Sequence, residues 1–440
     1  MAMRRVAIIG SGIAGLSVAH ALAHEAQITL FEAGRHFGGH TNTVDITLNG
    51  ITHGVDTGFL VLNERTYPNL LRLFEQLGVE IAKSDMSFSV QVPAARGRRN
   101  LEWSGTSLDS LFAQRANVLR PGFWRMVSDL LRFNRLATAL ALRGEDADLQ
   151  QPIADFLRQN RFSDEFRDWY FLPMLGCIWS CPVDQMLRFP VATMIRFCHN
   201  HGLLQIANRP QWYTVRGGAR TYVRKMLEAI PDARLGTPVR GVRRLVGTEE
   251  ASVCVTTDAG TERFDEVVMA CHSDQSLQLL SDPDPAEAKV LGAIRYQRNR
   301  AVLHTDTSLL PQRRRAWAAW NYERAATDAR EQASVCLHYL LNRLQPLPFK
   351  TPVVVSLNPV REPRPDTVHA EFDYAHPVFD TAAIAAQQHV PALQGRHHTW
   401  FCGAWTRYGF HEDGLMSGLA VCEGLRAAWA GARPRIREAA

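Results

Sequence analysis

The stretch RVAIIGSGIAGL, residues 5–16, decides the fold, because a short buried-strand pattern runs straight into three closely spaced glycines. Residues 5–10 predict a parallel strand, the GSGIAG run a tight turn, and residues 16–23 a helix rich in small side chains. Gly10 allows the sharp turn, Gly12 leaves room for a pyrophosphate, and Gly15 lets the helix pack closely on the strand. The free amides at the start of the helix would then face phosphates.

An acidic residue completes this pattern. A second strand is predicted over residues 28–31 and ends in Glu32, which lies 22 residues after Gly10. A carboxylate at this place can accept hydrogen bonds from both hydroxyls of an adenosine ribose and would repel a 2′-phosphate. Strand, turn, helix, strand and acid together predict a Rossmann-like α/β domain that binds a dinucleotide.

Composition limits the other partners. The chain has 440 residues, of which 46% are hydrophobic and 21% charged, which is typical of a globular protein with two domains. Its 49 basic and 44 acidic residues give a net charge of only +5, so we expect no nucleic-acid partner. No apolar run approaches the ~20 residues that span a bilayer. Arginine-rich patches at 96–99 and 313–315 would permit peripheral membrane contact, although a solvated surface is the simpler interpretation.

The cysteines and histidines predict no metal. Eight cysteines lack the short paired spacings of a zinc site, and no histidine pair has metal spacing with a third ligand nearby. Cys177 and Cys181, at i and i+4, are expected to share one face of a helix as small apolar residues. A reduced, cytoplasmic interior is therefore expected, with the membrane surface as the alternative location.

Further motifs follow in an order that belongs to a known family. Gly38-Gly39-His40-Thr41 comes shortly after Glu32, and a hairpin predicted to turn at Asn49-Gly50 closes on Val55-Asp56-Thr57-Gly58. This order resembles the flavin-containing amine oxidase and phytoene desaturase superfamily. The resemblance implies FAD as cofactor, a glutathione-reductase-type FAD-binding domain, and a glycine pair lying along the diphosphate and the isoalloxazine edge.

The resemblance covers nearly the whole chain. Arg216-Gly217-Gly218-Ala219 and the strands predicted over 235–270 match the returning segment of the FAD domain, in which Val239 would lie against adenine. GFxVxNxxTYPN at residues 58–69 and GFHEDGL at residues 409–415 are most similar to a bacterial family of predicted NAD/FAD-binding proteins. That family implies FAD and leaves the substrate open.

The matches interleave two domains. Residues 1–85, 210–290 and 390–435 would form the FAD-binding domain, residues 86–209 and 291–389 an α+β substrate domain, and residues 436–440 a tail. The substrate domain is expected to be helix-rich at first, as in residues 108–142. A second GxGxxG followed by an acid is absent from the sequence. This favours a flavin reduced by its own substrate and reoxidised by oxygen, a quinone or a carrier protein.

The glycine-rich stretch GFHEDGLMSG, residues 409–418, is expected to close the flavin site. It follows a strand predicted over 399–402 that ends at Gly403, and a helix is expected from Leu415 to Ala428. Gly414 would let the backbone approach, and the amides of Leu415 and Met416 would face flavin N1 and O2. His411 is the best candidate for a proton acceptor, because it precedes this helix.

The predicted site is therefore large. The predicted catalytic residues are His411, Leu415 and Met416. The predicted cofactor-binding residues are Gly10, Gly12, Ile13, Ala14, Gly15, Glu32, Ala33, Gly38, Gly39, His40, Thr41, Asp56, Gly58, Val239, Gly403, Gly414, Leu415 and Met416.

Three departures from the family pattern bear on the substrate. Residues 294–302 contain no lysine, which many amine oxidases of the family use near flavin N5, and Leu415 stands where mitochondrial-type monoamine oxidases have a tyrosine. Ala404 follows Gly403 where the family often has an acid for the ribityl chain. The first two departures, together with aromatic groups at residues 169–179 and 317–322, favour a bulky apolar substrate.

The sequence thus predicts an FAD-dependent oxidoreductase that takes a hydride from a lipid acyl or isoprenoid chain to flavin N5. Two alternatives stay open at this point. One is an amine or amino-acid oxidase with a cage built from other residues, such as Tyr322 or Tyr374. The other is a flavin-binding redox sensor without turnover.

Overall fold

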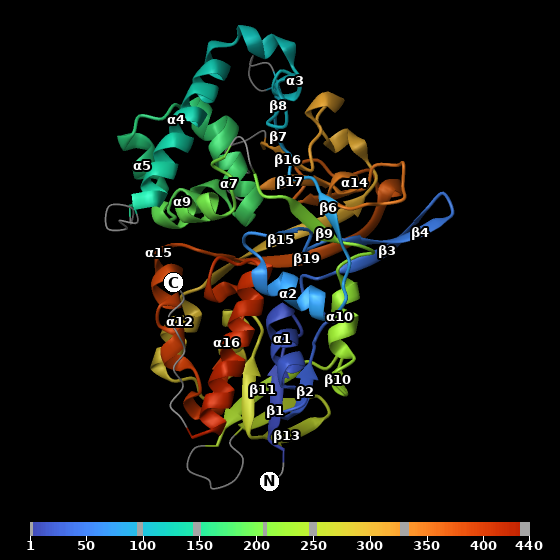
Figure 1. The fold of residues 1–440 in the computed structure, drawn as a ribbon, viewed down its shortest axis with the longest axis vertical. Helices are drawn as coiled ribbons and strands as arrows, with labels where there is room; N and C mark the ends of the chain where they lie inside the picture. The colour runs from blue at the N-terminus through green and yellow to red at the C-terminus, as the bar shows by residue number, and fades with distance from the viewer. Residues whose placement is uncertain are drawn as a thin grey trace.

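The computed structural model describes residues 3–94, 100–143, 151–205, 209–245, 253–325 and 334–431. The arginine patch at 96–99 and the tail at 436–440 lie outside the described residues. The chain forms one unit around a parallel sheet and another around a larger mixed sheet. The first unit lies at the bottom of Figure 1, near the N-terminus, and the second lies above it.

The lower unit is built on a parallel sheet of five strands in the order β10-β2-β1-β14-β20. Val6 and Ile8 of β1 pack in one apolar cluster, and Ala7 and Ile9 pack in another on the opposite face. A strand covered on both faces needs such a continuous apolar run, and the predicted first strand is confirmed. The strands are β1 (Arg5–Ile9), β2 (Gln27–Phe31), β10 (Asp232–Arg234), β14 (Glu266–Met269) and β20 (Thr399–Phe401).

Helices cover one face of this sheet and a small antiparallel sheet covers the other. The covering helices include α1 (Ile13–Leu22), α10 (Arg220–Leu227) and α16 (His411–Trp429). The small sheet consists of β11 (Val239–Arg244), β12 (Val253–Thr257) and β13 (Gly260–Phe264). Helices α1 and α16 cross closely, because a Cβ at Gly418 would lie 2.1 Å from the hydroxyl of Ser17.

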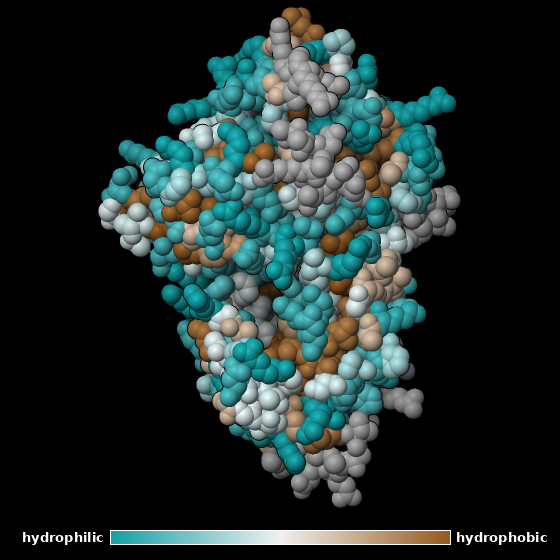
Figure 2. Space-filling view, turned by 180° about the vertical axis from the view of Figure 1, so that it is seen from behind, coloured by the Kyte–Doolittle hydropathy of each residue, from teal (hydrophilic) through white to brown (hydrophobic). Residues whose placement is uncertain are grey.

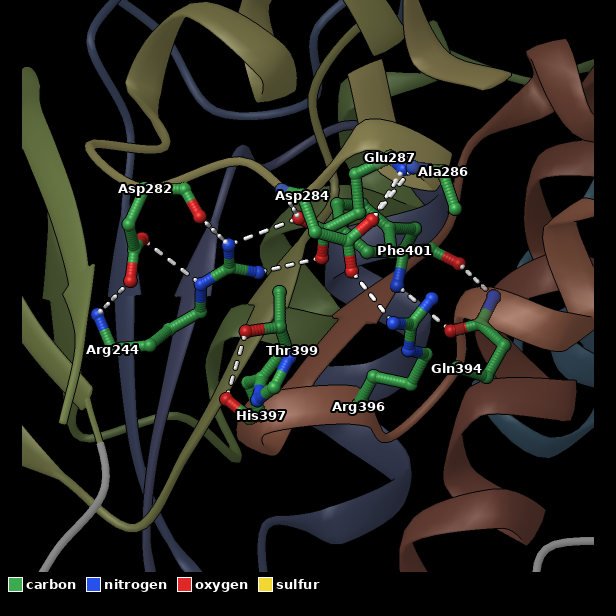
Figure 3. A network of polar contacts seen from close by, with 10 residues as sticks. All are labelled: Arg244, Asp282, Asp284, Ala286, Glu287, Gln394, Arg396, His397, Thr399 and Phe401. Carbon is green, nitrogen blue, oxygen red and sulfur yellow. Dashed lines mark hydrogen bonds and ion pairs between the residues drawn. The ribbon is translucent and has the colours of Figure 1, made fainter. Parts of the chain in front are cut away.

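A buried ion pair ties α12 (Pro285–Gly292), which follows α11 (Ser273–Leu279), to β11 (Figure 3). Arg244 Nη1 lies 2.5 Å from Oε1 of Glu287, and both side chains are almost fully buried. Asp284 accepts a hydrogen bond from the Glu287 amide, and Arg396 pairs with Asp284 at 2.8 Å. Removing one member of a buried ion pair costs about 3–5 kcal/mol. The network therefore fixes the returning segment against the residues that lead into β20.

The upper unit is a seven-stranded sheet in the order β19-β15-β18-β17-β16-β7-β8, capped by helices on one side (Figure 1). Its strands are β7 (Phe88–Val92), β8 (Leu101–Ser104), β15 (Arg295–His304), β16 (Trp320–Glu323), β17 (Cys336–Leu340), β18 (Val354–Leu357) and β19 (Val368–Val378). The helices are α3 (Leu108–Leu111), α4 (Pro121–Arg143), α5 (Ile153–Gln159), α6 (Asp164–Phe166), α7 (Leu172–Trp179), α8 (Val183–Met186) and α9 (Val191–Asn200). The two units draw on interleaved stretches of chain, while the exact domain boundaries stay a prediction.

Shorter elements join the units. The predicted hairpin is confirmed, with Asn49 and Gly50 at φ 52° and 79°, in the left-handed region that such turns need. The connecting strands are β3 (Thr43–Leu48), β4 (Ile51–Asp56), β5 (Leu62–Asn63), β6 (Ile81–Ser84) and β9 (Trp212–Val215). The connecting helices are α2 (Pro68–Gln76), α14 (Leu341–Leu344) and α15 (Thr381–Gln387).

Two local predictions are wrong. Cys177 and Cys181 do not share a helix face, because α7 ends at Trp179 and Ser180 adopts a left-handed φ of 50°. Both thiols are nevertheless buried and free. The last helix begins at His411, not at Leu415, because Phe410 caps it: the Phe410 amide donates a hydrogen bond to the Asp413 carboxylate.

Candidate active site

A cavity of about 720 Å³ runs from the turn after β1 into the upper unit. The carboxyl ends of β1, β2, β14 and β20 open onto it, which is where α/β sheets bind their ligands. Its two halves have different walls. One half is lined by backbone-rich turns of the parallel sheet, and the other by side chains of the seven-stranded sheet and its helices.

The glycine turn has the geometry that a diphosphate requires. Gly10 has φ 104°, and a Cβ at Gly15 would lie only 1.9 Å from the carbonyl oxygen of Gly10. At Gly12 a Cβ would meet no protein atom within 4 Å, so it would project into open space. Packing within the protein therefore does not require a glycine at position 12. The missing side chain instead leaves room for a bound phosphate.

Glu32 lines the cavity at the end of β2. Its carboxylate accepts hydrogen bonds from the Gly34 amide at 2.7 Å and from the Ser11 amide at 3.0 Å, and the Ser11 hydroxyl donates to the same oxygen as the Ser11 amide. The oxygen facing Gly34 keeps one acceptor site for a ribose hydroxyl. A second ribose hydroxyl would replace that of Ser11.

Histidines gather where the glycine pair meets the upper unit. His40 stacks on Tyr374 at 5.0 Å between ring centroids and lies 5.3 Å from His376. Burial lowers the pKa of His40 and His272 to about 4 and that of His376 to about 3, so all three are neutral near pH 7. Nε2 of His40 is buried without a hydrogen-bond partner among the described residues, which fits a polar group of a bound cofactor.

His411, the predicted proton acceptor, does line the cavity. Its ring stacks on Phe59 at 3.8 Å, and its Nε2 lies 2.7 Å from the hydroxyl of Tyr222, which in turn bonds Thr41. Burial lowers the pKa of His411 to about 3. A group this weakly basic is suited to holding Tyr222 and to donating or accepting one hydrogen bond, and it is a poor general base at pH 7. Thr41 itself does not line the cavity and is linked to it only by the hydrogen bonds through Tyr222 to His411.

Asp56 lies beneath the cavity wall. It accepts a hydrogen bond from the Ala219 amide at 2.9 Å, another from Gln345 at 2.6 Å, and a third from Thr43. Asp56 thus joins the DxG motif to the RGGA turn and does not line the cavity. Burial raises the pKa of its carboxyl to about 6.

The end of the GFHEDGLMSG stretch also lies outside the lining. Leu415 is 2% exposed and packs in the core, and its amide, like that of Met416, belongs to the second turn of α16. A Cβ at Gly414 would lie 2.7 Å from Ile13, so this glycine serves the contact of α16 with α1. The first free amides of α16 come from His411 onward, one turn earlier than predicted.

The predicted site residues therefore divide into two groups. Those that line the cavity are Gly10, Gly12, Ile13, Ala14, Glu32, Ala33, Gly38, Gly39, His40, Gly58, Val239, Gly403 and His411. Those placed behind its wall are Gly15, Thr41, Asp56, Gly414, Leu415 and Met416.

Sequence reasoning missed other lining residues. Cys271 and His272 follow the carboxyl end of β14, a position that could have been recognised as facing the ligand edge of the sheet. Tyr374, which the amine-oxidase alternative names as a cage residue, does line the cavity from β19; His376 lines it from the same strand, and Tyr296 lines it from β15. No local pattern indicated that these two strands lie over the parallel sheet.

The far half of the cavity is an apolar arm. Its wall is formed mainly by Met86, Phe88, Met174, Cys177, Ile178, Phe197, Leu203, Trp212, Trp320, Tyr339, Val355 and Leu357. Two polar residues, Ser180 and His201, also lie among these side chains, and burial lowers the pKa of His201 to about 4, so it is neutral near pH 7. Among all described lining residues Glu32 is the only carboxylate, and there is no lysine or arginine. Of the predicted aromatic groups, Trp320 lines the arm, whereas Trp169, Tyr170, Phe171, Trp179, Trp317 and Tyr322 do not.

On the opposite face of the seven-stranded sheet lies the one group of described residues that could hold a metal ion: Glu323, Cys336 and His338. Hydrogen bonds already account for this group. The Asp306 amide donates to His304 Nδ1, so His304 Nε2 carries the proton that Ser356 accepts at 2.7 Å. The Ser356 hydroxyl can then donate to His338, whose Nε2 lies 2.9 Å from Glu323.

Several solved structures share this fold. A protein assigned as protoporphyrinogen oxidase from Exiguobacterium sp. 255-15 is 18% identical, with 97% of this chain and 100% of that chain covered at a TM-score of 0.66. A fatty acid isomerase from P. acnes that produces CLA is 15% identical, with 94% and 97% covered at a TM-score of 0.63. Wild-type putrescine oxidase bound to putrescine is 14% identical, with 96% and 99% covered at a TM-score of 0.66.

At these low identities the solved structures show only the fold, whereas a family model shows the family. The model for flavin-containing amine oxidoreductases matches residues 13–312, more than half of the chain. That match, the open space at Gly12 and the carboxylate at Glu32 agree on FAD as the cofactor. The chain belongs to the flavin-containing amine oxidoreductase family and is an FAD-dependent oxidoreductase.

Proposed function

We propose that this enzyme dehydrogenates a bulky, uncharged, apolar substrate such as an isoprenoid or a neutral lipid. The observation that carries the proposal is the apolar arm, whose described lining residues include no charged side chain. A buried ammonium or carboxylate without a partner costs several kcal/mol, so a charged group would bind poorly there. The structural neighbours act on fatty acids and on amines alike, so their likeness does not choose between substrates.

The residues of the chain have defined tasks in this proposal. FAD, when bound, supplies the hydride acceptor, and the glycine turn, Glu32 and the glycine pair would hold it. Trp320, Tyr339 and Leu357 would hold the apolar chain and exclude water from the reacting carbon. The neutral His40 and His376 would offer hydrogen bonds without adding charge. Oxygen, a quinone or a carrier protein would then take the electrons.

Anaerobic flavin bleaching tests the proposal. The holoenzyme is mixed with neutral lipid fractions, free fatty acids, monoamines, diamines or amino acids, and the flavin absorbance is followed. We expect bleaching by a neutral lipid fraction, with loss of two hydrogens from the product by mass analysis. Introducing a carboxylate into the arm with Leu357→Asp should slow this bleaching, while Leu235→Asp, on the exposed surface, should not.

Two outcomes would contradict the proposal. Rapid bleaching by an amine or amino acid, with none by neutral lipids, would identify an amine oxidase with an unusual cage. A yellow protein that no metabolite class reduces would favour a flavin-binding redox sensor.

A further inference from the structure

The large apolar side chains that remain exposed are concentrated in one segment. Nine such residues are exposed among those described, and six of them fall between residues 108 and 142. We call this set the apolar face: Leu108, Val118, Leu119, Trp124, Leu131 and Leu142. Leu119 is 85% exposed, the highest value of the nine. Single exposed apolar residues are ordinary, but a group this dense on one surface marks an interaction site.

Most of the apolar face follows α4 and the segment just before it. Trp124, Leu131 and Leu142 are spaced by 7 and 11 residues, which places them on the same side of a helix with 3.6 residues per turn. The Trp124 indole donates a hydrogen bond to the carbonyl of Val118 at 2.8 Å, which joins the two parts. The protein core is on the other side of α4, where Phe123 and Phe133 are fully buried.

The position of this face suits a flat partner. Helices α3 and α4 lie at the top of the molecule, at the end opposite the parallel sheet (Figure 1). Seen from behind, a small group of hydrophobic atoms stands at this same extremity (Figure 2). None of the helices in the described ranges is long and apolar enough to cross a membrane.

Positive charge accompanies the apolar residues. Residues 108–143 contain six arginines and two aspartates, a net charge of +4, while the whole chain has only +5. Arg135 lies four residues after Leu131 and is exposed on the same side of α4. Arg115, Arg125 and Arg132 form ion pairs with Asp109, Glu165 and Asp129, and an excess of positive charge remains on the segment. Leu and Trp side chains beside such an excess match the boundary between the headgroups and acyl chains of an anionic lipid surface.

We propose that the apolar face docks the enzyme on a membrane containing anionic lipid, with Leu119 and Trp124 inserted among the headgroups. This inference rests on the proposed function, since a membrane is where an uncharged apolar substrate would be found. Helix α4 packs on α9, whose Phe197 lines the apolar arm. Helices α4 and α9 therefore separate the docked side of the molecule from the substrate half of the cavity.

Vesicle sedimentation tests the docking without any substrate. The FAD-loaded protein is mixed with vesicles of phosphatidylcholine alone or of phosphatidylcholine with phosphatidylglycerol. We expect binding to the second kind, weakened by salt, and a loss of about tenfold or more in Leu119→Glu/Trp124→Glu. Ile51→Glu, at an exposed apolar residue of the β3–β4 hairpin, is the matched control and should bind like the wild type. Flavin content and melting temperature show that each variant is folded.

A second readout follows Trp124 itself. Bromine-labelled lipid should quench part of the wild-type tryptophan fluorescence, and Trp124→Phe should lose that part. Equal vesicle binding by Leu119→Glu/Trp124→Glu and the wild type would overturn the proposal. A wild-type dimer formed without lipid and lost in this variant would also overturn it, because a second copy would then cover the face. Docking that persists while no lipid bleaches the flavin would refute only the proposed function.

Discussion

Gly12 and Gly15 lie in the same turn but should respond to alanine in opposite ways. At Gly12 the backbone has φ −61° and ψ 173°, which alanine adopts without strain, and a Cβ would meet no protein atom within 4 Å. Gly12→Ala should therefore change the free energy of unfolding of the FAD-free protein by less than about 1 kcal/mol. The added methyl would occupy the space of the diphosphate, so the loss should fall on FAD binding.

At Gly15 the clash is with the protein itself. A Cβ would lie 1.9 Å from the Gly10 carbonyl oxygen, whereas ordinary contact begins at 3.4 Å. Helix α1 would have to move away from β1 by more than an ångström, and overpacking of this kind costs about 1–3 kcal/mol or more. Gly15→Ala should therefore destabilise the protein even when FAD is absent.

Two measurements separate the variants. Urea unfolding of the FAD-free proteins gives their stability, and quenching of flavin fluorescence during titration gives the dissociation constant for FAD. We expect Gly12→Ala to weaken FAD binding at least about 100-fold, or about 2.7 kcal/mol. Wild-type affinity in Gly12→Ala, or a loss of stability in FAD-free Gly12→Ala equal to that in Gly15→Ala, would refute this account of the turn.

Three further predictions concern the core. Ser356→Ala leaves nitrogens of His304 and His338 without partners and should destabilise the protein by about 2–5 kcal/mol in urea unfolding, while the exposed Ser128→Ala should have little effect. Leu415→Tyr should lower the melting temperature without changing substrate choice, because Leu415 is a core residue; an altered substrate range at unchanged stability would contradict its placement. Stability should fall as pH drops from 6.5 toward 4, because burial lowers the pKa of six histidines to about 3 or 4, so that only the unfolded chain protonates them. Burial raises the pKa of the Asp56 and Asp413 carboxyls to about 6, so these two groups release protons on unfolding and partly offset the histidines. At pH 5.5 unfolding should still take up about four protons in total. The slope of unfolding free energy against pH, from urea unfolding, measures this number.

The sequence was informative where the chemistry is local. The turn from β1 to α1, the acid at the end of β2 and the hairpin at Asn49 each depend on a few consecutive residues, and each is found where it was predicted. The relevant constraints, a positive φ at Gly10 and a close approach at Gly15, can be satisfied by almost no other residue type. Such positions can therefore be recognised from the sequence alone.

The rest of the site depends on contacts between distant segments. Asp56 looked like a ligand-binding acid, but its partners are Ala219 and Gln345, 163 and 289 residues away. Leu415 was predicted at the start of the last helix but lies in its second turn, behind the cavity wall. The reason is that the cap formed by Phe410 and Asp413 starts α16 four residues earlier. Tyr374 could be placed over the cavity only by knowing that β19 is the edge strand beside β15.

The charge distribution of the cavity links cofactor binding to substrate choice. FAD brings a negatively charged diphosphate, yet no described lysine or arginine lines the cavity and the histidines are neutral. Backbone dipoles then offer the compensating potential, and the first turn of α1, which carries no acidic residue, supplies it at the glycine turn. Helix dipoles act within about one turn, so they can stabilise the cofactor without reaching the apolar arm. A charged substrate would find no partner there, and this is the physical reason to expect an uncharged one.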